Sequence, residues 1–334
     1  MTRSKLLGFA LGLTGLLVLA VPALASAALT GAGSTLVAPL MANWISGFEG
    51  GGGTSVKYAA VGSGEGIKQI ANRTVDFGAS DAPMTSEQAA ECNGCVTIPW
   101  ALSATGVGVN VPGVSKLNLS GPVLAEIFMG KIKKWNDKKI AALNPKAKLP
   151  STAITPVFRS DGSGDTYAFT NYLSKVSPAW RSQYGFGTSV GFKAGIGAKG
   201  NTGVTSALKT PGAIGYVAVA YLIGAGLHAA AIENAAGNFE LPNLTNIEEA
   251  ASVVKTVRPN SGVSIVDPPK KATKAYPIST FTYAIVPATA PQATAVKEFI
   301  GYAITKGQSF GAALDFAPLP NVVLSAAQKA LSSL

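Results

Sequence analysis

Three short stretches rich in glycine and hydroxyl residues constrain the fold of this chain more than any other feature. They read TGAGSTL (30–36), AVGSGEG (60–66) and RSDGSGDT (159–166), and at each of them a strand-like pattern gives way to a helical one. Glycine allows the sharp turn that such a junction needs. A chain that repeats this junction alternates strands with helices, so we expect an α/β fold.

The hydrophobic patterns outside these junctions predict the individual elements. Strands are expected at 56–61, 75–80, 96–102, 105–111, 154–158 and 276–286. Helices are expected at 36–48, 64–75, 121–128 with Ser120 as the cap, 293–304 and 321–331. The stretch RSDGSGDT should start a further helix, which carries Phe169, Leu173 and Val176 on its apolar side.

One apolar stretch, residues 213–232, contains no formal charge and is long enough to cross a membrane. It is mostly alanine and glycine, and it contains the β-branched and aromatic run GYVAVAYLI as well as His228. This composition favours a buried strand followed by a loop or helix over a transmembrane helix.

The amino-terminal segment has the pattern of a secretory signal peptide over residues 1–27. Arg3 and Lys5 precede an apolar run from Leu6 to Ala20, and Ala25-Ser26-Ala27 offers a cleavage site. The mature protein is therefore expected to start at Ala28 and to be exported, with a periplasmic or extracellular location.

The two cysteines, Cys92 and Cys95, are the only ones in the chain. Export to an oxidising compartment permits a disulfide between them, which we favour over a redox C-x-x-C motif. A zinc site is not expected, because His228 is the only histidine and no second cysteine pair exists.

The formal net charge of +10 indicates a protein that attracts anions. Nucleic acid is not expected as a partner, because the charges are sparse and no basic run is interleaved with aromatic residues. The lysines of KKATK (270–274) are expected to lie in a solvated loop.

The three glycine-rich stretches share the chemistry of anion binding at a helix start. Unpaired N–H groups and a partial positive charge gather there, and serine or threonine hydroxyls add donors. Helix capping uses the same residue types and explains any one stretch alone. The P-loop motif, the third glycine of the dinucleotide fingerprint and the G-x-S-x-G elbow are all missing. A hydrolase triad would depend on His228, whose apolar sequence neighbours favour a place in the core.

Taken together, several stretches resemble the phosphate-binding proteins of the Pst ABC transporter. They are TGAGSTLVAPLMANW, VGSGEGIKQI, VDFGASDAPM, EIFMGKIKKW, RSDGSGDTYAFTNYLSKVS, KGNTGV with PGAIGYVAVAYL, and YPI, which follow one another along the whole mature chain. The resemblance implies a two-lobed periplasmic-binding-protein fold, with a hinge and a ligand cleft between the lobes. Lobe one would comprise residues 28–101 plus 280–334, and lobe two residues 102–279.

The resemblance also implies which residues bind phosphate. They are Thr35, Leu36 through its backbone N–H, Ser63, Asp81, Arg159, Ser163, Gly164 through its backbone N–H, and Asp165. Members of the family often carry threonine in place of Asp165, so this residue either accepts a hydrogen bond or contributes only its backbone N–H. Asp161 is expected to hold Arg159, and Glu65 to point away from the anion.

The function implied by the resemblance is capture of inorganic phosphate for an ABC permease and its ATPase subunits, by a monomer that has no catalytic activity and no metal or cofactor. Phosphate at neutral pH keeps a proton that Asp81 is able to accept, whereas sulfate has none, so Asp81 should select phosphate. Two alternatives stay open: a binding protein for arsenate, sulfate or molybdate, or a phosphate-ester hydrolase. The hydrolase lacks a metal site and an activated nucleophile.

Overall fold

The protein is described by a computed structural model that covers residues 27–258 and 260–334. The predicted signal peptide, residues 1–27, lies outside the described residues apart from its last position. Within the part of the chain that the structure describes, no helix is both long enough and apolar enough to cross a bilayer.

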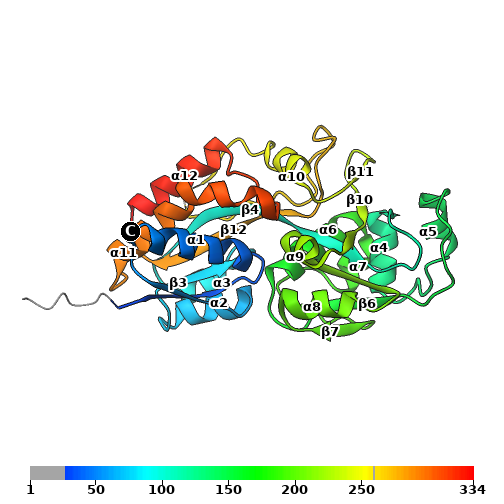
Figure 1. Cartoon of the computed structure of the whole chain (residues 1–334), viewed down its shortest axis with the longest axis horizontal. Helices are drawn as coiled ribbons and strands as arrows, with labels where there is room; N and C mark the ends of the chain where they lie inside the picture. The colour runs from blue at the N-terminus through cyan, green and yellow to red at the C-terminus, as the bar shows by residue number, and fades with distance from the viewer. Residues whose placement is uncertain (1–26, 259) are drawn as a thin grey trace, which may run out of the picture.

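The amino-terminal elements form one half of an elongated molecule (Figure 1). Here β1 pairs in parallel with β2 on one side and with β3 on the other. Their bounds are β1 Leu29–Gly33, α1 Ala38–Gly50, β2 Val56–Ala60, α2 Ser63–Ala71, β3 Phe77–Ser80 and α3 Ser86–Glu91. Each helix follows the carboxyl end of a strand, so the glycine-rich stretches at 30–36 and 60–66 lie at one edge of this parallel sheet.

A single strand of 15 residues, β4 (Cys95–Val109), runs from this half into the other. Its first part pairs with β12 (Ser279–Pro287), and its last part pairs with β8 (Ala213–Ala218) and β9 (His228–Ala229). The two separate strands expected at 96–102 and 105–111 are therefore wrong. Ser103 and Ala104, which lie between them, keep the ladder intact by pairing with residues of β12.

The other half carries most of the remaining helices and the strands around β8. The sheet continues from β4 through β8 and β6 to β7, and β6 pairs in parallel with both of its neighbours. The bounds are β5 Asn118–Leu119, α4 Gly121–Phe128, α5 Lys138–Leu143, β6 Thr155–Arg159, α6 Gly164–Val176, α7 Pro178–Gln183, β7 Ile196–Ala198, α8 Gly200–Leu208, α9 Val219–Ala225, β10 Ala231–Glu233, β11 Phe239–Glu240 and α10 Leu244–Ala251.

After β12 the chain returns to the first half, where α11 (Ala293–Ala303), two short 3-10 turns and α12 (Asn321–Ser332) end it. Figure 1 accordingly places the last helices beside α1, at the end of the molecule opposite to α5. The overall architecture is α/β, as the sequence predicts.

Buried aromatic side chains fill the core, and their polar atoms have partners. Trp44 on α1 packs against Trp100 on β4, with ring centroids 5.2 Å apart. The Trp44 indole donates to the carbonyl of Gly307, and that of Trp100 to the hydroxyl of Thr282. Burying these rings with satisfied N–H groups ties α1, β4 and β12 into one unit.

Two details of the sequence prediction need comment. The apolar stretch 213–232 forms β8 followed by α9, which confirms the expected strand and helix. Ser120 occupies the cap position of α4, but its side chain makes no capping hydrogen bond.

The glycine at the end of β1 gives a test of the first junction. Gly33 has a φ of +142°, and a Cβ added there would lie 2.0 Å from the carbonyl oxygen of Ala79 on β3. We expect Gly33→Ala to lower the free energy of unfolding by about 2–4 kcal/mol, because backbone cannot move aside as a flexible side chain would.

Urea denaturation of residues 28–334 measures this loss. The control is Gly50→Ala at the end of α1, where an added Cβ meets nothing within 4 Å. Equal stability of the two variants would contradict the close approach of β1 and β3.

Candidate functional site

The first two glycine-rich stretches meet at the carboxyl edge of the parallel strands. Ser34, Thr35 and Leu36 follow β1, Ser63 begins α2 after β2, and Asp81 follows β3. All five side chains are buried. Parallel strands bring their carboxyl ends to one edge of the sheet, and ligands of open α/β sheets bind there.

Asp81 is the centre of this edge. Its carboxylate accepts hydrogen bonds from the hydroxyls of Ser34 and Ser63, and its backbone N–H donates to Ser63 Oγ at 3.1 Å. Burial, followed by the charge of Asp165, raises the pKa of Asp81 from 3.8 to about 7. A buried carboxyl poised near neutrality is typical of a functional site.

The third stretch, from the other half of the molecule, packs directly against this edge. Ser63 Oγ accepts a hydrogen bond from the backbone N–H of Gly164 at 3.1 Å, and the N–H of Gly64 donates to the carbonyl of Gly162 at 3.0 Å. A Cβ on Gly164 would lie 2.4 Å from Cβ of Asp81. Glycine at position 164 is therefore required by the contact itself.

Arg159, the last residue of β6, is almost fully buried and held by two carboxylates. Its Nε and Nη2 donate to the two carboxylate oxygens of Asp161, and its Nη1 donates to Asp165 Oδ2 at 2.9 Å. The expectation that Asp161 holds Arg159 is confirmed. Three of the five guanidinium N–H groups are used in these bonds, which leaves one on each of Nη1 and Nη2 for another acceptor.

Both the carboxylate and the backbone N–H of Asp165 are hydrogen-bonded within the protein. Its carboxylate accepts from Thr105 Oγ1, from Arg159 Nη1 and from Asn201 Nδ2, at 2.8 to 2.9 Å. Its backbone N–H donates to Ser163 Oγ, which caps the start of α6. Burial raises the pKa of Asp165, and the charge of Arg159 opposes this shift.

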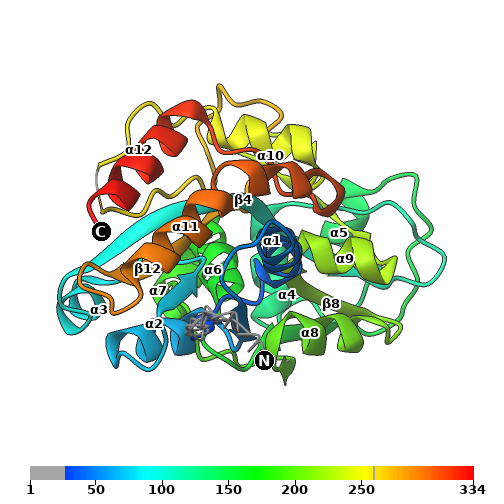
Figure 2. The same cartoon turned by 60° about the vertical axis from the view of Figure 1, so that its left-hand side comes forward.

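The structure adds residues that the sequence did not single out. Asn201, near the start of α8, donates from its amide to Thr35 Oγ1 at 2.9 Å and to Asp165 Oδ2 at 2.8 Å. Tyr221 on α9 donates to the carbonyl of Thr35 at 3.0 Å. Figure 2 shows α1 with α9, the helix that carries Tyr221, at its side and α8, the helix that carries Asn201, below. The glycine beside Asn201 in KGNTGV is a signal that could have found it, whereas nothing marks Thr105 inside β4.

Two single residues lie outside this cluster. Glu65 is exposed and accepts a hydrogen bond from Gln69, so the expectation that it points away from the site is confirmed. His228, expected in the core, is exposed at the start of the short strand β9, so that expectation is wrong. The apolar sequence neighbours of His228 did not imply burial. Among the residues that the structure describes, β9 lies at the border of the sheet and pairs only with β4.

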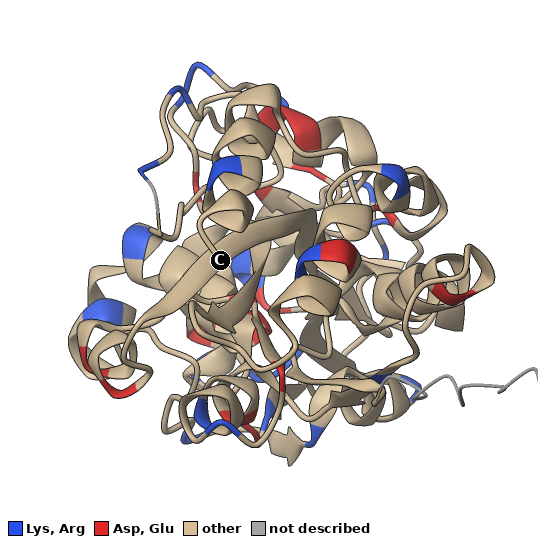
Figure 3. Cartoon of the chain, turned by 90° about the vertical axis from the view of Figure 1, so that its left-hand side faces the viewer, with Lys and Arg blue, Asp and Glu red and all other residues tan. Residues whose placement is uncertain are grey.

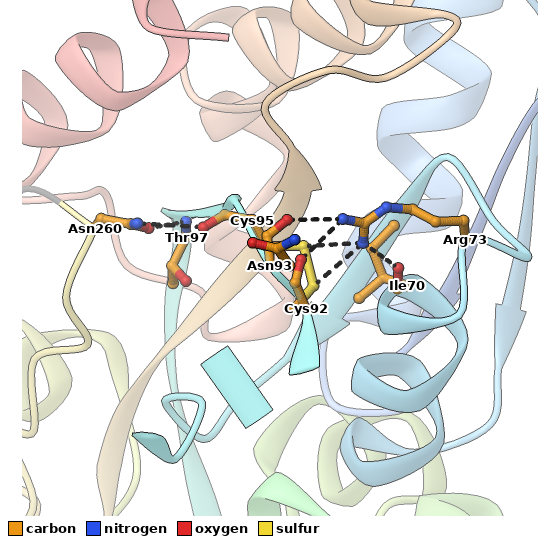
Figure 4. Close-up of a disulfide and its surroundings, with 7 residues drawn as sticks. All are labelled: Ile70, Arg73, Cys92, Asn93, Cys95, Thr97 and Asn260. Atoms are coloured by element: carbon orange, nitrogen blue, oxygen red, sulfur yellow. Dashed lines mark hydrogen bonds between the residues drawn. A yellow bond between two sulfur atoms is a disulfide. The ribbon is translucent and has the colours of Figure 1, made fainter. Parts of the chain in front are cut away.

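The two cysteines form a disulfide between the end of α3 and the start of β4. The guanidinium of Arg73 lies against it and donates to the carbonyls of Ile70, Cys92 and Asn93 (Figure 4). Asn260 donates to the carbonyl of Cys95 from the other side. These contacts give the disulfide the setting of a structural link between α2, α3 and β4.

Chemically, the cluster combines a fixed cation, short hydroxyl donors, backbone N–H groups and two buried carboxyls. The donors suit an oxyanion, and Asp81 suits a ligand that still carries a proton. Among residues 27–258 and 260–334, no group of three or more His, Cys, Asp or Glu side chains is placed to hold a metal ion.

Comparison with known proteins supports the same chemistry. A family model described as "PBP superfamily domain" matches residues 20–306. The phosphate-binding protein PstS of Haemophilus influenzae is 40% identical over 303 residues, which are 89% of this chain and 90% of the relative. The protein of the same name from Pasteurella multocida is 40% identical over 90% of this chain and 88% of its own.

Solved structures share the fold. A high-affinity periplasmic phosphate-binding protein with bound phosphate superposes with a TM-score of 0.75 at 22% identity, over 90% of this chain and 93% of the other. A substrate-binding protein from Clostridium perfringens with bound phosphate has a TM-score of 0.65 at 18% identity, over 88% of this chain and 100% of the other. The periplasmic-binding-protein fold expected from the sequence is therefore confirmed.

The raised pKa of Asp81 predicts how stability depends on pH when no anion is bound. The folded protein keeps a proton that the unfolded chain releases between about pH 4 and pH 7. The contribution of Asp81 to stability is therefore largest in acid and is lost as the pH rises through about 7. This loss of unfolding free energy amounts to at most about 4 kcal/mol. We expect Asp81→Asn to abolish it, because asparagine does not titrate.

Denaturation midpoints of anion-free protein at about pH 5 and about pH 8 measure the effect. Glu65→Gln, which removes an exposed carboxylate from the neighbouring helix, is the matched control. The assignment fails if Asp81→Asn keeps the full pH dependence of the unaltered protein.

Proposed function

The chain belongs to the PBP superfamily and, within it, to the PstS phosphate-binding proteins, and from this premise we propose that it captures inorganic phosphate and delivers it to an ABC permease. The observation that carries the proposal is the meeting of Ser63, Asp81 and Arg159 with the start of α6 in one buried cluster. The proposed contacts are those inferred from the resemblance: Thr35, Leu36, Ser63, Asp81, Arg159, Ser163, Gly164 and Asp165.

In this proposal, the residues that attract the anion differ from the residue that selects phosphate over sulfate. The free N–H groups of Arg159, the hydroxyl of Ser163 and backbone N–H groups donate to phosphate oxygens. The hydroxyl of Ser63 donates to Asp81 in this structure and would turn to the anion when phosphate binds. Asp81 in its ionised form accepts the proton that phosphate retains. Sulfate has no proton to offer, so it would place its oxygen lone pairs against those of the carboxylate in a dry site.

We propose two lobes that close on the ligand, with lobe one at 28–101 plus 280–334 and lobe two at 102–279. The change of β4 partners supports a division within this strand and lies three residues beyond the proposed boundary, since Ala104 pairs with β12 and Thr105 pairs with β8. The contacts of Gly164 with Ser63 and of Asn201 with Thr35 cross this boundary. Donors from both sides would then reach one anion, and β4 would be part of the hinge.

The wider setting follows from the same premise. We propose an exported, monomeric protein that acts in the periplasm or outside the cell after its signal peptide is cleaved. Its partners would be the permease and ATPase subunits of a phosphate ABC transporter. We propose no catalytic role, because the relatives of this chain are named as phosphate-binding proteins.

Calorimetric titration of residues 28–334, freed of bound anion, tests the proposed ligand. At about pH 8 we expect tight binding of phosphate and negligible heat from sulfate, because Asp81 is then ionised. At about pH 5 the preference for phosphate over sulfate should be smaller, because a protonated Asp81 donates a hydrogen bond that sulfate accepts. Arsenate, which also keeps a proton, is expected to bind in both conditions. Tight sulfate binding without phosphate binding would overturn the proposal.

A substitution at Asp81 separates selection from attraction. We expect Asp81→Asn to reduce the preference for phosphate over sulfate by about tenfold or more, because the amide donates to either anion. The control is Ser160→Ala, which removes an exposed hydroxyl from the same loop as Arg159. An unchanged preference in Asp81→Asn would remove the selective role of Asp81 while leaving phosphate as the ligand.

A further inference from the structure

Positive charge is concentrated in one short segment of the chain. Residues 131–148 contain seven lysines and one aspartate, so this segment carries +6 of the formal net charge of +10. The lysines are Lys131, Lys133, Lys134, Lys138, Lys139, Lys146 and Lys148. The segment holds more lysines than the three of the 270–274 run, and it has no part in the proposed phosphate site.

Every one of these lysines is exposed, whereas Ile132, Trp135 and Ile140 between them are buried. Trp135 lies in the core and donates to the carbonyl of Gly212, and Ile140 anchors the short helix α5. The segment is therefore held by its apolar side, and its ammonium groups are presented to solvent.

Neighbouring acidic groups neutralise little of this charge. Glu126 pairs with Lys139 at 2.6 Å, and Asp137 accepts the backbone N–H of Lys139 at the start of α5. Within residues 27–258 and 260–334, the other six lysines of the segment have no ion pair. Lys116 adds a further cation, because it lines a groove of about 620 Å³ together with Lys146 and Lys148. We call these eight lysines the lysine end.

The lysine end projects from one extreme of the molecule. Figure 1 places α5 at the right-hand end of the long axis, with the C-terminus at the other end. Figure 3 views the molecule from that other end, where Lys and Arg segments are mixed with Asp and Glu segments. Positive charge is therefore concentrated toward one end of the long axis.

The type of cation indicates the type of partner. The segment contains no arginine, so bidentate recognition of bases or fixed phosphates is not its chemistry. Its only aromatic residue, Trp135, is buried and so neither stacks on bases nor inserts into a bilayer. Flexible, hydrated ammonium groups spread over an exposed end suit a surface of many mobile anionic groups.

We propose that the lysine end binds the surface of a bilayer rich in anionic phospholipid. The interaction is peripheral and electrostatic, and it holds the protein at the membrane independently of phosphate binding.

Sedimentation with vesicles tests this inference. We expect residues 28–334 to sediment with phosphatidylcholine vesicles that contain about 30% phosphatidylglycerol, and not with pure phosphatidylcholine. Raising the salt from about 50 mM to about 500 mM should release the protein. The triple variant Lys133→Glu, Lys134→Glu, Lys138→Glu should lose about tenfold or more in partitioning, with phosphate titration unchanged.

The matched control changes the net charge by the same amount elsewhere. Lys270→Glu, Lys271→Glu and Lys274→Glu alter three exposed lysines near α10 and should retain most of the vesicle binding. Equal losses in the two triple variants would overturn the proposal, because net charge alone would then explain binding. Binding to soluble linear polyphosphate or to DNA, without binding to anionic vesicles, would also overturn it.

Discussion

The burial of charge is the constraint on which the rest of the site depends. Arg159 is buried with the carboxyl groups of Asp161 and Asp165, and Asp81 lies within electrostatic reach of Asp165. One guanidinium therefore pairs with two carboxyls, and a third, that of Asp81, lies near Asp165 in surroundings where water screens charges little. Burial is the main cause of the raised pKa values of Asp81 and Asp165, and the charge of Asp165 adds to the shift of Asp81. An anion bound there, as we propose, would be attracted by hydroxyls, helix starts and N–H dipoles more than by net charge.

Much of the fold could be predicted because its signals are local. The strands at 56–60 and 77–80 and the helices at 293–303 and 321–332 carry clear periodicities in their own residues. The length of β4 could not be predicted, since only pairing with β12 and β8 keeps Ser103 and Ala104 extended. The exposure of His228 was missed for a related reason: the position of a strand in the sheet is a tertiary property.

The residues of the candidate site also divide into those with a local sequence signal and those brought together only by folding. The glycine-rich stretches could be found because turns and helix starts select glycine and hydroxyl residues, whichever ligand is bound. Their meeting at Ser63, Asp81 and Gly164 could be expected only from the family resemblance. Asn201 and Thr105 stayed hidden, because their polar groups are brought to Asp165 by the packing of α8 and β4. The lysine end was likewise overlooked, since only folding shows that Ile132, Trp135 and Ile140 are buried while all of its lysines remain exposed.

The continuity of β4 also constrains how the chain is able to evolve. Successive residues of a strand point to opposite faces of the sheet, and both halves of the molecule pair with this one strand. The register with β12 already shifts at Trp100, so an irregularity is accommodated there. Between Ala101 and Thr105, inserting or deleting one residue would exchange inner and outer faces beyond that point and put Thr105 on the side away from Asp165. Changes in length are therefore expected to be tolerated better in surface loops such as 184–195 than between Ala101 and Thr105, where both halves depend on the register of one strand.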